Sequence, residues 1–163
     1  MSDLDQMYQQ IILDAARERH GEGQLPSAQG ESFQVNPSCG DEVTMQVELV
    51  DGKIHLAWDG HGCSISQASI SLMSELVENK SVAELDQLYD AFHHMMELRG
   101  GELDEESADL LEDASALVGV SKFPMRIKCA LLGWMALRDA TAQAIAETAP
   151  DNSTSATNLE EGN

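Results

Sequence analysis

The chain has 163 residues, of which 29 are acidic and 9 basic, so its formal net charge is -20 at pH 7. This length suits one domain with a hydrophobic core. The negative charge repels the phosphates of nucleic acids, and no apolar run approaches the roughly 20 residues that a membrane span needs. The N-terminus, Met1–Asp5, is acidic where a signal peptide would be basic, and the three cysteines show no paired spacing. We therefore expect a cytoplasmic protein with no nucleic-acid partner and no membrane partner.

An amphipathic helix is predicted over residues 2–20. Apolar side chains recur at helical spacing from Leu4 to Ala15. Basic residues near the C-terminal end, Arg19 among them, suit the negative end of the helix dipole. Gly21 follows and is expected to stop the helix.

The strictest pattern in the chain predicts a β-hairpin. Apolar and polar residues alternate over residues 43–50 and again over 54–58, and Asp51-Gly52 between them is typical of a type I′ turn. A short strand over residues 32–35 is expected to precede the hairpin. Antiparallel pairing brings the start and the end of such a hairpin to the same end of the sheet.

Helical patterns follow the hairpin. Ser81 with Glu84 forms a capping box, and Ser121 can cap the last and most apolar helix. The predicted helices cover residues 64–78, 81–99, 105–118 and 121–146. Strands followed only by helices indicate an α+β fold, with a small antiparallel sheet of about three strands packed against several helices.

Three cysteines and one aspartate are the candidate ligands of a metal site. Cys39 and Asp41 precede the hairpin, Cys63 follows it, and Cys129 lies in the last helix. Three thiols and a carboxylate form a complete set of four ligands for zinc. The scattered spacing is equally compatible with three unrelated thiols, because a free cysteine often behaves as a small buried hydrophobe.

Other residues near these cysteines have less specific roles. His61 could bind the metal, although a histidine in a loop is usually solvated. Arg126 lies three residues before Cys129, on nearly the same helix face, and could pair with Asp41 or with a thiolate, or be an ordinary exposed arginine. A nucleophilic Cys-His-Asp triad is also compatible with the sequence, but it would leave two cysteines unexplained.

Three motifs in the same order resemble those of a known family. They are Asn-Pro-x-Cys-Gly-Asp at 36–41, Gly-x-Gly-Cys-x-Ile-Ser-x-Ala-Ser-x-Ser-x-Met at 60–73, and Pro-x-Arg-x-Lys-Cys-x-x-Leu-x-Trp at 124–134. Over about residues 4–146 the chain resembles SufU. SufU is the zinc-containing sulfur-transfer branch of the IscU/NifU N-terminal family of iron–sulfur cluster assembly proteins.

The resemblance implies a SufE/NifU-like fold and a zinc ion bound by Cys39, Asp41, Cys63 and Cys129. It also implies that Cys39 accepts sulfur from the persulfide of a SufS-type, pyridoxal-phosphate cysteine desulfurase. The chain would then be a zinc-dependent sulfurtransferase, acting as co-substrate and activator of that enzyme. Cys39 and Arg126 are our candidate catalytic residues, and downstream Suf scaffold proteins are candidate further partners.

Two alternatives to sulfur transfer stay open. The three cysteines could hold a nascent iron–sulfur cluster on a scaffold, or the zinc site could be purely structural. Lys128 stands where IscU has a histidine, and no Leu-Pro-Pro-Val-Lys motif is present, which favours the SufU branch. The segment 14–19 departs from the usual SufU pattern, so contacts made by that region cannot be carried over from the family.

The resemblance and the composition also suggest the domain boundaries. We expect a SufU/IscU-like domain over residues 1–148, with an acidic insertion at about 100–121 that separates SufU from IscU. The remaining residues, 149–163, are polar with one leucine and are predicted to be a disordered acidic tail.

Overall fold

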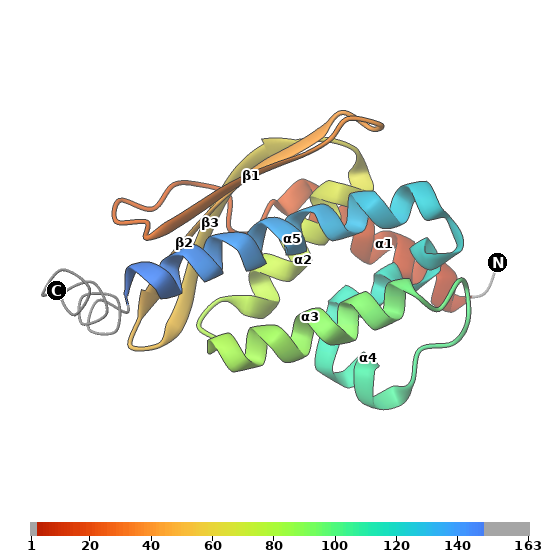
Figure 1. The fold of residues 1–163 in the computed structure, drawn as a ribbon. Coiled ribbons are helices and arrows are strands. Elements are labelled where there is room, and N and C mark those ends of the chain that lie inside the picture. The colour runs from red at the N-terminus through yellow and green to blue at the C-terminus, as the bar shows by residue number, and fades with distance from the viewer. Residues whose placement is uncertain (1–2, 149–163) are drawn as a thin grey trace, which may run out of the picture.

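The computed structural model describes residues 3–148 of the chain (Figure 1). Its elements, in chain order, are α1 (Asp3–Glu18), β1 (Gly30–Asn36), β2 (Asp41–Val50), β3 (Lys53–His61), α2 (Ser64–Val77), α3 (Val82–Met96), α4 (Glu105–Leu111), the 3₁₀ helix η1 (Glu112–Lys122) and α5 (Pro124–Glu147). The predicted α+β fold with a three-stranded antiparallel sheet is confirmed. The predicted tail, 149–163, lies outside the described residues, and the domain boundaries stay predictions.

The sheet is an antiparallel meander in the order β1-β2-β3. Asp51 and Gly52, between β2 and β3, have φ angles of 54° and 76°, the positive values that a type I′ turn requires. The predicted hairpin is therefore confirmed. Its register pairs Glu42 with His61, and β1 pairs Asn36 with Asp41, so these four residues meet at one end of the sheet.

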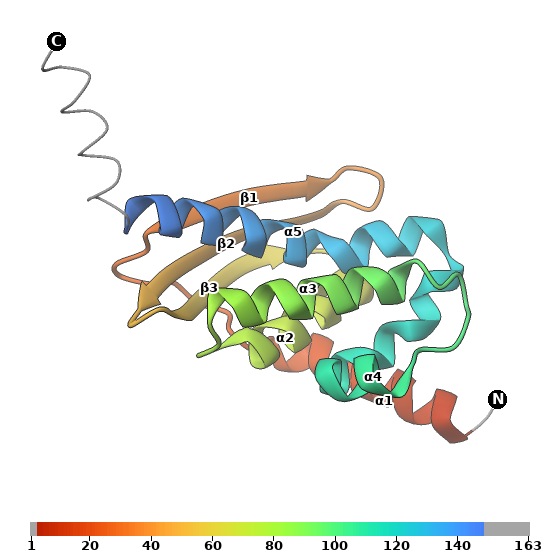
Figure 2. The same ribbon diagram turned by 60° about the horizontal axis from the view of Figure 1, so that its bottom comes forward.

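The helices gather on one face of the sheet. The last helix, α5, runs across β1 and β2; α2 packs beside α5, and α1 packs against α2 (Figure 2). Trp58 on β3 and Trp134 on α5 are fully buried in the core between these layers. Strand β2 alternates buried and half-buried side chains because only one of its faces meets the helices.

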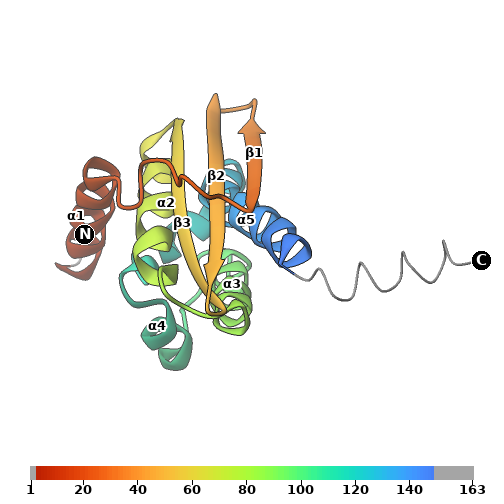
Figure 3. The same cartoon turned by 90° about the vertical axis from the view of Figure 1, so that its left-hand side faces the viewer.

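The segment between α1 and β1 crosses the opposite face of the sheet (Figure 3). The backbone N–H of Gly23 donates to the carbonyl of Trp58, and the N–H of Leu25 donates to the side chain of Gln46. Helix α1 ends at Glu18, two residues earlier than predicted, because Arg19 adopts a left-handed φ of 49°. The side chain of Arg19 is thus directed to the sheet and not to the helix end.

The predicted capping box of α3 is confirmed. The Ser81 hydroxyl accepts a hydrogen bond from the Glu84 N–H at 3.1 Å, and the Glu84 carboxylate accepts one from the Ser81 N–H at 2.9 Å. Within residues 3–148, no helix is both long and apolar enough to cross a membrane.

Two predictions between α3 and α5 are wrong. The single helix expected over 105–118 ends at Leu111, because Glu112 has a left-handed φ of 50°, and the chain continues as η1. Ser121 does not cap α5: its hydroxyl accepts from the N–H of Gly100 and donates to the carbonyl of Val118. Helix α5 therefore begins after Phe123 without a side-chain cap.

Candidate metal centre

The carboxylate of Asp41 lies at the centre of the candidate site. Asp41 is the first residue of β2. It lies on the strand face that packs against the helices and is fully buried. Cys63 follows the end of β3 and occupies the N-cap of α2. One carboxylate oxygen of Asp41, Oδ1, accepts the backbone N–H of Cys63 at 2.8 Å, and the other, Oδ2, lies 3.8 Å from the Cys63 sulfur.

Cys39 lies in the tight turn that joins β1 to β2. The N–H groups of Cys39 and Gly40 both donate to the carbonyl of Asn36, at 3.2 and 3.0 Å, and Gly40 has a φ of 71°. This turn leaves Cys39 exposed to solvent at the end of the sheet. Cys39 is the most exposed of the three cysteines, since Cys63 is half-buried and Cys129 is buried.

Cys129 lies on α5 and reaches the other candidate ligands from that helix. It is 2% exposed, and its sulfur lies 3.2 Å from the sulfur of Cys39. The side-chain amide of Asn36 points at the Cys129 sulfur, with a nitrogen–sulfur distance of 3.6 Å. The ligand atoms of Cys39, Asp41 and Cys129 all lie within 4.8 Å of one another, which is close enough to hold one metal ion.

The other predicted site residues are less closely placed. Cys63 contacts Asp41 and Cys129 but falls outside the compact set of three. The guanidinium of Arg126 lies over the Phe123 ring, 4.6 Å from its centroid, and no contact with Asp41 or with a cysteine is found for it among residues 3–148. His61 is bound to Glu42 at 2.9 Å and its side chain is 72% exposed, so it does not face the three clustered ligands.

The electrostatics of the cluster favour a bound cation. Burial raises the pKa of the Cys129 thiol above its ordinary value, and its contacts with Asp41, Cys39 and Cys63 raise it further. No lysine, arginine or histidine forms an ion pair with Asp41 within the described part of the chain. A fully buried carboxylate beside cysteine thiols, without an ion pair to a basic side chain of residues 3–148, fits a thiolate- and oxygen-binding divalent metal.

Two residues that shape this site had no role in the sequence analysis. Asn36 holds the Cys39 turn through its carbonyl and faces Cys129 with its amide. At Gly62 a side-chain Cβ would come 2.3 Å from the Oδ1 atom of Asp41, so only glycine lets the carboxylate reach the N–H of Cys63. Both residues belong to the motifs at 36–41 and 60–73, but their contacts are made by the fold.

A comparison with protein families identifies the domain. The model described as "NifU-like N terminal domain" matches residues 7–130, more than two thirds of the chain. The chain belongs to this family. Two named relatives are similar to this chain over most of its length. The zinc-dependent sulfurtransferase SufU of Bacillus subtilis (strain 168) is 40% identical over 147 residues, which are 87% of this chain and 94% of that protein.

The second relative is the iron–sulfur cluster assembly scaffold protein IscU of Streptococcus pyogenes serotype M1. It is 37% identical over 141 residues, 86% of each chain. Among solved structures, a protein of Fervidobacterium islandicum AW-1 is similar with a TM-score of 0.71 and 34% identity. That structure is named as an iron–sulfur cluster assembly scaffold for the SUF system (FiSufU), and the match covers 80% of this chain and 93% of that one. The similar proteins thus agree on the NifU-like family, but their names include both a sulfurtransferase and scaffolds.

Proposed function

We propose that this NifU-like protein is a zinc-dependent sulfur-transfer protein of iron–sulfur cluster assembly. In this proposal Cys39 accepts sulfur from the persulfide of a SufS-type, pyridoxal-phosphate cysteine desulfurase in the cytoplasm. One observation carries the proposal: the exposed sulfur of Cys39 lies 3.2 Å from the buried sulfur of Cys129, within a cluster that includes the buried carboxylate of Asp41. The name of the 40%-identical Bacillus subtilis relative agrees with it.

Zinc would be held by Cys39, Asp41, Cys63 and Cys129. The first, second and fourth of these already form a compact group, and Cys63 is joined to it through Asp41. When bound, zinc would keep the thiols deprotonated near neutral pH, the state in which cysteine is a nucleophile.

Sulfur transfer at Cys39 is a thiol–persulfide exchange. The Cys39 thiolate attacks the outer sulfur of the desulfurase persulfide, and a new sulfur–sulfur bond forms on Cys39. The bond between the two sulfurs of the desulfurase persulfide breaks, and the desulfurase cysteine leaves as a thiolate. Cys39 ends as a persulfide, so the exchange balances without an added oxidant or reductant.

Exposure and backbone setting distinguish Cys39 from the other two cysteines. Cys39 lies in an exposed turn next to Gly40, whereas Cys129 is buried within α5 and Cys63 caps α2. A change in the position of the Cys39 sulfur disturbs a turn only. The same change at Cys129 would disturb packing between α5 and β1.

Arg126 is the cation that we propose to meet the negative charge of the persulfide. It lies on the exposed surface of the first turn of α5, three residues before Cys129. Its guanidinium contacts the ring of Phe123, which is itself exposed, so the charge is open to solvent. Substitution of Arg126 should therefore slow sulfur acceptance more than it weakens metal binding.

A scaffold function is the second candidate. It is favoured by the sulfurs of Cys39 and Cys129, which lie 3.2 Å apart, and by the scaffold name of the 37%-identical Streptococcus pyogenes relative. Metal content separates the two functions, because a scaffold purified without air would carry iron and sulfide with visible absorption, whereas the sulfur-transfer protein would carry colourless zinc.

The experiment measures bound zinc and sulfide release together. Wild type, Cys39→Ser, Cys63→Ser and Cys129→Ser are each mixed with a SufS-type desulfurase, cysteine and a reductant. We expect Cys39→Ser to retain zinc, more weakly, and to give no stimulation, while the other two serine variants lose zinc. Ser38→Ala, an exposed change on the same turn, is the matched control and should behave as wild type. Full stimulation by Cys39→Ser would exclude the proposed role of this residue.

A further inference from the structure

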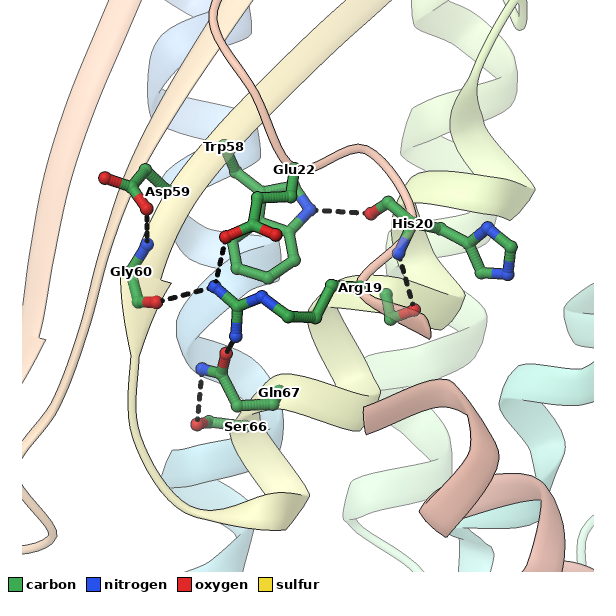
Figure 4. Close-up of polar contacts among 9 residues, drawn as sticks. Arg19, His20, Glu22, Trp58, Asp59, Gly60, Ser66 and Gln67 are labelled. Carbon is green, nitrogen blue, oxygen red and sulfur yellow. Dashed lines mark hydrogen bonds and ion pairs between the residues drawn. The ribbon is translucent and has the colours of Figure 1, made fainter. Parts of the chain in front are cut away.

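Arg19 makes four separate contacts just beyond the end of α1 (Figure 4). Its guanidinium donates to the carbonyl of Gly60 at 2.8 Å, to the side-chain oxygen of Gln67, and to the carboxylate of Glu22 at 2.8 Å. Its Cζ atom also lies 4.7 Å from the centroid of the Trp58 ring. The planar fork of five N–H donors in arginine makes such a set of contacts possible, and no other side chain offers it.

Two of these contacts bracket the loop that carries Cys63. Gly60 lies near the end of β3, three residues before Cys63, and Gln67 lies in the first turn of α2, four residues after it. Gln67 is itself tied to the loop, because its backbone N–H donates to the Cys63 carbonyl at 3.1 Å. Ser66 donates its hydroxyl to the same carbonyl at 3.1 Å.

The surroundings hold the guanidinium in place. Glu22 lies in the turn after α1 and keeps one guanidinium nitrogen occupied, and it raises the pKa of Arg19 above its ordinary value. The Trp58 ring is fully buried, and its indole N–H donates to the carbonyl of His20 at 2.7 Å. The ring is therefore a fixed platform for the side chain of Arg19. With 27% of its side chain exposed, Arg19 is shielded from most competing water.

We propose that Arg19 is a positioning residue that fixes the Cys63 loop against Asp41. By joining the end of β3 to the first turn of α2, it keeps the N–H and the sulfur of Cys63 facing the Asp41 carboxylate. The effect of Arg19 on zinc affinity rests on the proposed function, whereas its effect on the position of the Cys63 loop does not. Arg19 belongs to the segment 14–19, whose sequence departs from the SufU pattern, so this clamp comes from this chain's own residues.

Substitutions separate the clamp from a general contribution of Arg19 to folding. Arg19→Ala removes all four contacts. Arg19→Lys keeps the charge but cannot reach Gly60 and Gln67 at the same time, because an ammonium lacks the fork. Arg17→Ala is the matched control, since Arg17 lies two residues earlier, in the last turn of α1, has a 73% exposed side chain and pairs with Asp14 at 2.7 Å.

The test uses metal-free and zinc-loaded full-length protein. In chelator-treated protein we measure hydrogen exchange of the amides of residues 62–65 and the alkylation rates of the three thiols. Zinc affinity is then measured by competition with a chromophoric chelator.

In Arg19→Ala we expect the amide hydrogens of residues 62–65 to exchange faster and Cys63 to be alkylated faster, while the alkylation rate of Cys129 stays unchanged. Zinc affinity should fall about tenfold or more, as when a supporting residue of a metal site is lost. Arg19→Lys should lie between, and Arg17→Ala should match wild type.

Two results would overturn the inference. One is unchanged exchange of residues 62–65 in Arg19→Ala, and the other is an equal rise in exchange across the core of α2 and α5, which would mean general destabilisation. If Arg19→Ala does not fold, Arg19→Lys and Gln67→Ala supply the same comparison. If wild type binds no zinc, the proposed function fails, while exchange and alkylation in metal-free protein still decide the role of Arg19.

Discussion

The buried carboxylate of Asp41 accepts the backbone N–H of Cys63 at 2.8 Å, so one candidate ligand positions another. The contact joins the start of β2 to the N-cap of α2, two elements that the hairpin brings to the same end of the sheet. The remaining carboxylate oxygen, Oδ2, faces the Cys63 sulfur at 3.8 Å. Asp41 thus has a structural role toward the loop, and in the proposed function it also brings its negative charge to the metal.

These two roles of Asp41 can be separated by substitution. Asp41→Asn keeps an oxygen that accepts the Cys63 N–H but removes the negative charge, whereas Asp41→Ala removes both. We expect Asp41→Asn to lower zinc affinity by about tenfold or more while the fold is kept. Asp41→Ala should lower the affinity further and also increase amide exchange at Cys63. Equal zinc affinity in wild type and both variants, measured by chelator competition, would show that Asp41 is not a ligand.

Gly62→Ala tests the close approach of the Cys63 loop to Asp41. The new Cβ would lie 2.3 Å from the Asp41 Oδ1 and 2.7 Å from the Ser66 hydroxyl, so the carboxylate must move. We expect weaker zinc binding and a loss of about 1–3 kcal/mol in the free energy of unfolding, as for other overpacked sites. Gly119→Ala is the control, because a Cβ there meets no atom within 4 Å. A Gly62→Ala protein with wild-type zinc affinity would contradict this geometry.

Removal of the metal should lower thermal stability. The candidate ligands come from the β1–β2 turn, β2, α2 and α5, so metal binding links elements far apart in the chain. Free zinc at about 1,000 times its dissociation constant stabilises a protein by about 4 kcal/mol, which is roughly 8–16 °C in Tm for a domain of this size. Calorimetry before and after chelation, with zinc added back, measures the difference. A melting curve that does not change after confirmed zinc removal would rule out this linkage.

The capping box of α3 predicts an acid-sensitive contribution to stability. The hydrogen bond from the Ser81 N–H lowers the pKa of the Glu84 carboxyl below its ordinary value of 4.5. Because the pKa of Glu84 is lower in the folded protein, its ionised carboxylate stabilises the fold fully at any pH above the pKa of the unfolded chain. This stabilisation is lost as the pH falls through the pKa of the folded protein. Wild type should therefore be more stable than Glu84→Gln at pH 7, and the difference should shrink below about pH 4.5. Urea unfolding at a series of pH values measures it, and a difference that is independent of pH would refute the prediction.

Short-range patterns predicted the sheet and the capping box because their causes lie within a few residues. The alternation in 43–58 and the Asp51-Gly52 turn determine the hairpin, and the hairpin brings Asp41 to the same end of the sheet as Cys63. The failures have long-range causes. Ser121 was expected to cap α5, but its hydroxyl is held by the N–H of Gly100, 21 residues earlier in the chain.

The supporting residues of the site were missed for the same reason. Arg19 reaches Gly60 and Gln67, which are 41 and 48 residues away in sequence. Asn36 meets Cys129 across 93 residues. No periodicity or capping pattern reports such contacts, since they exist only after the helices have packed on the sheet. The left-handed φ of 50° at Glu112 falls on a residue that is not glycine, so the sequence carries no signal for it.

The most direct measurement of the central claim is the location of sulfur after reaction with the desulfurase. Zinc-loaded protein is incubated with a SufS-type desulfurase and cysteine without reductant, alkylated, digested and analysed by mass spectrometry. We predict one additional sulfur atom on the peptide that contains Cys39, and none on the peptides of Cys63 and Cys129. In Cys39→Ser no peptide should gain sulfur. Sulfur on Cys63 or Cys129 in wild type, or on any cysteine of Cys39→Ser, would contradict the account.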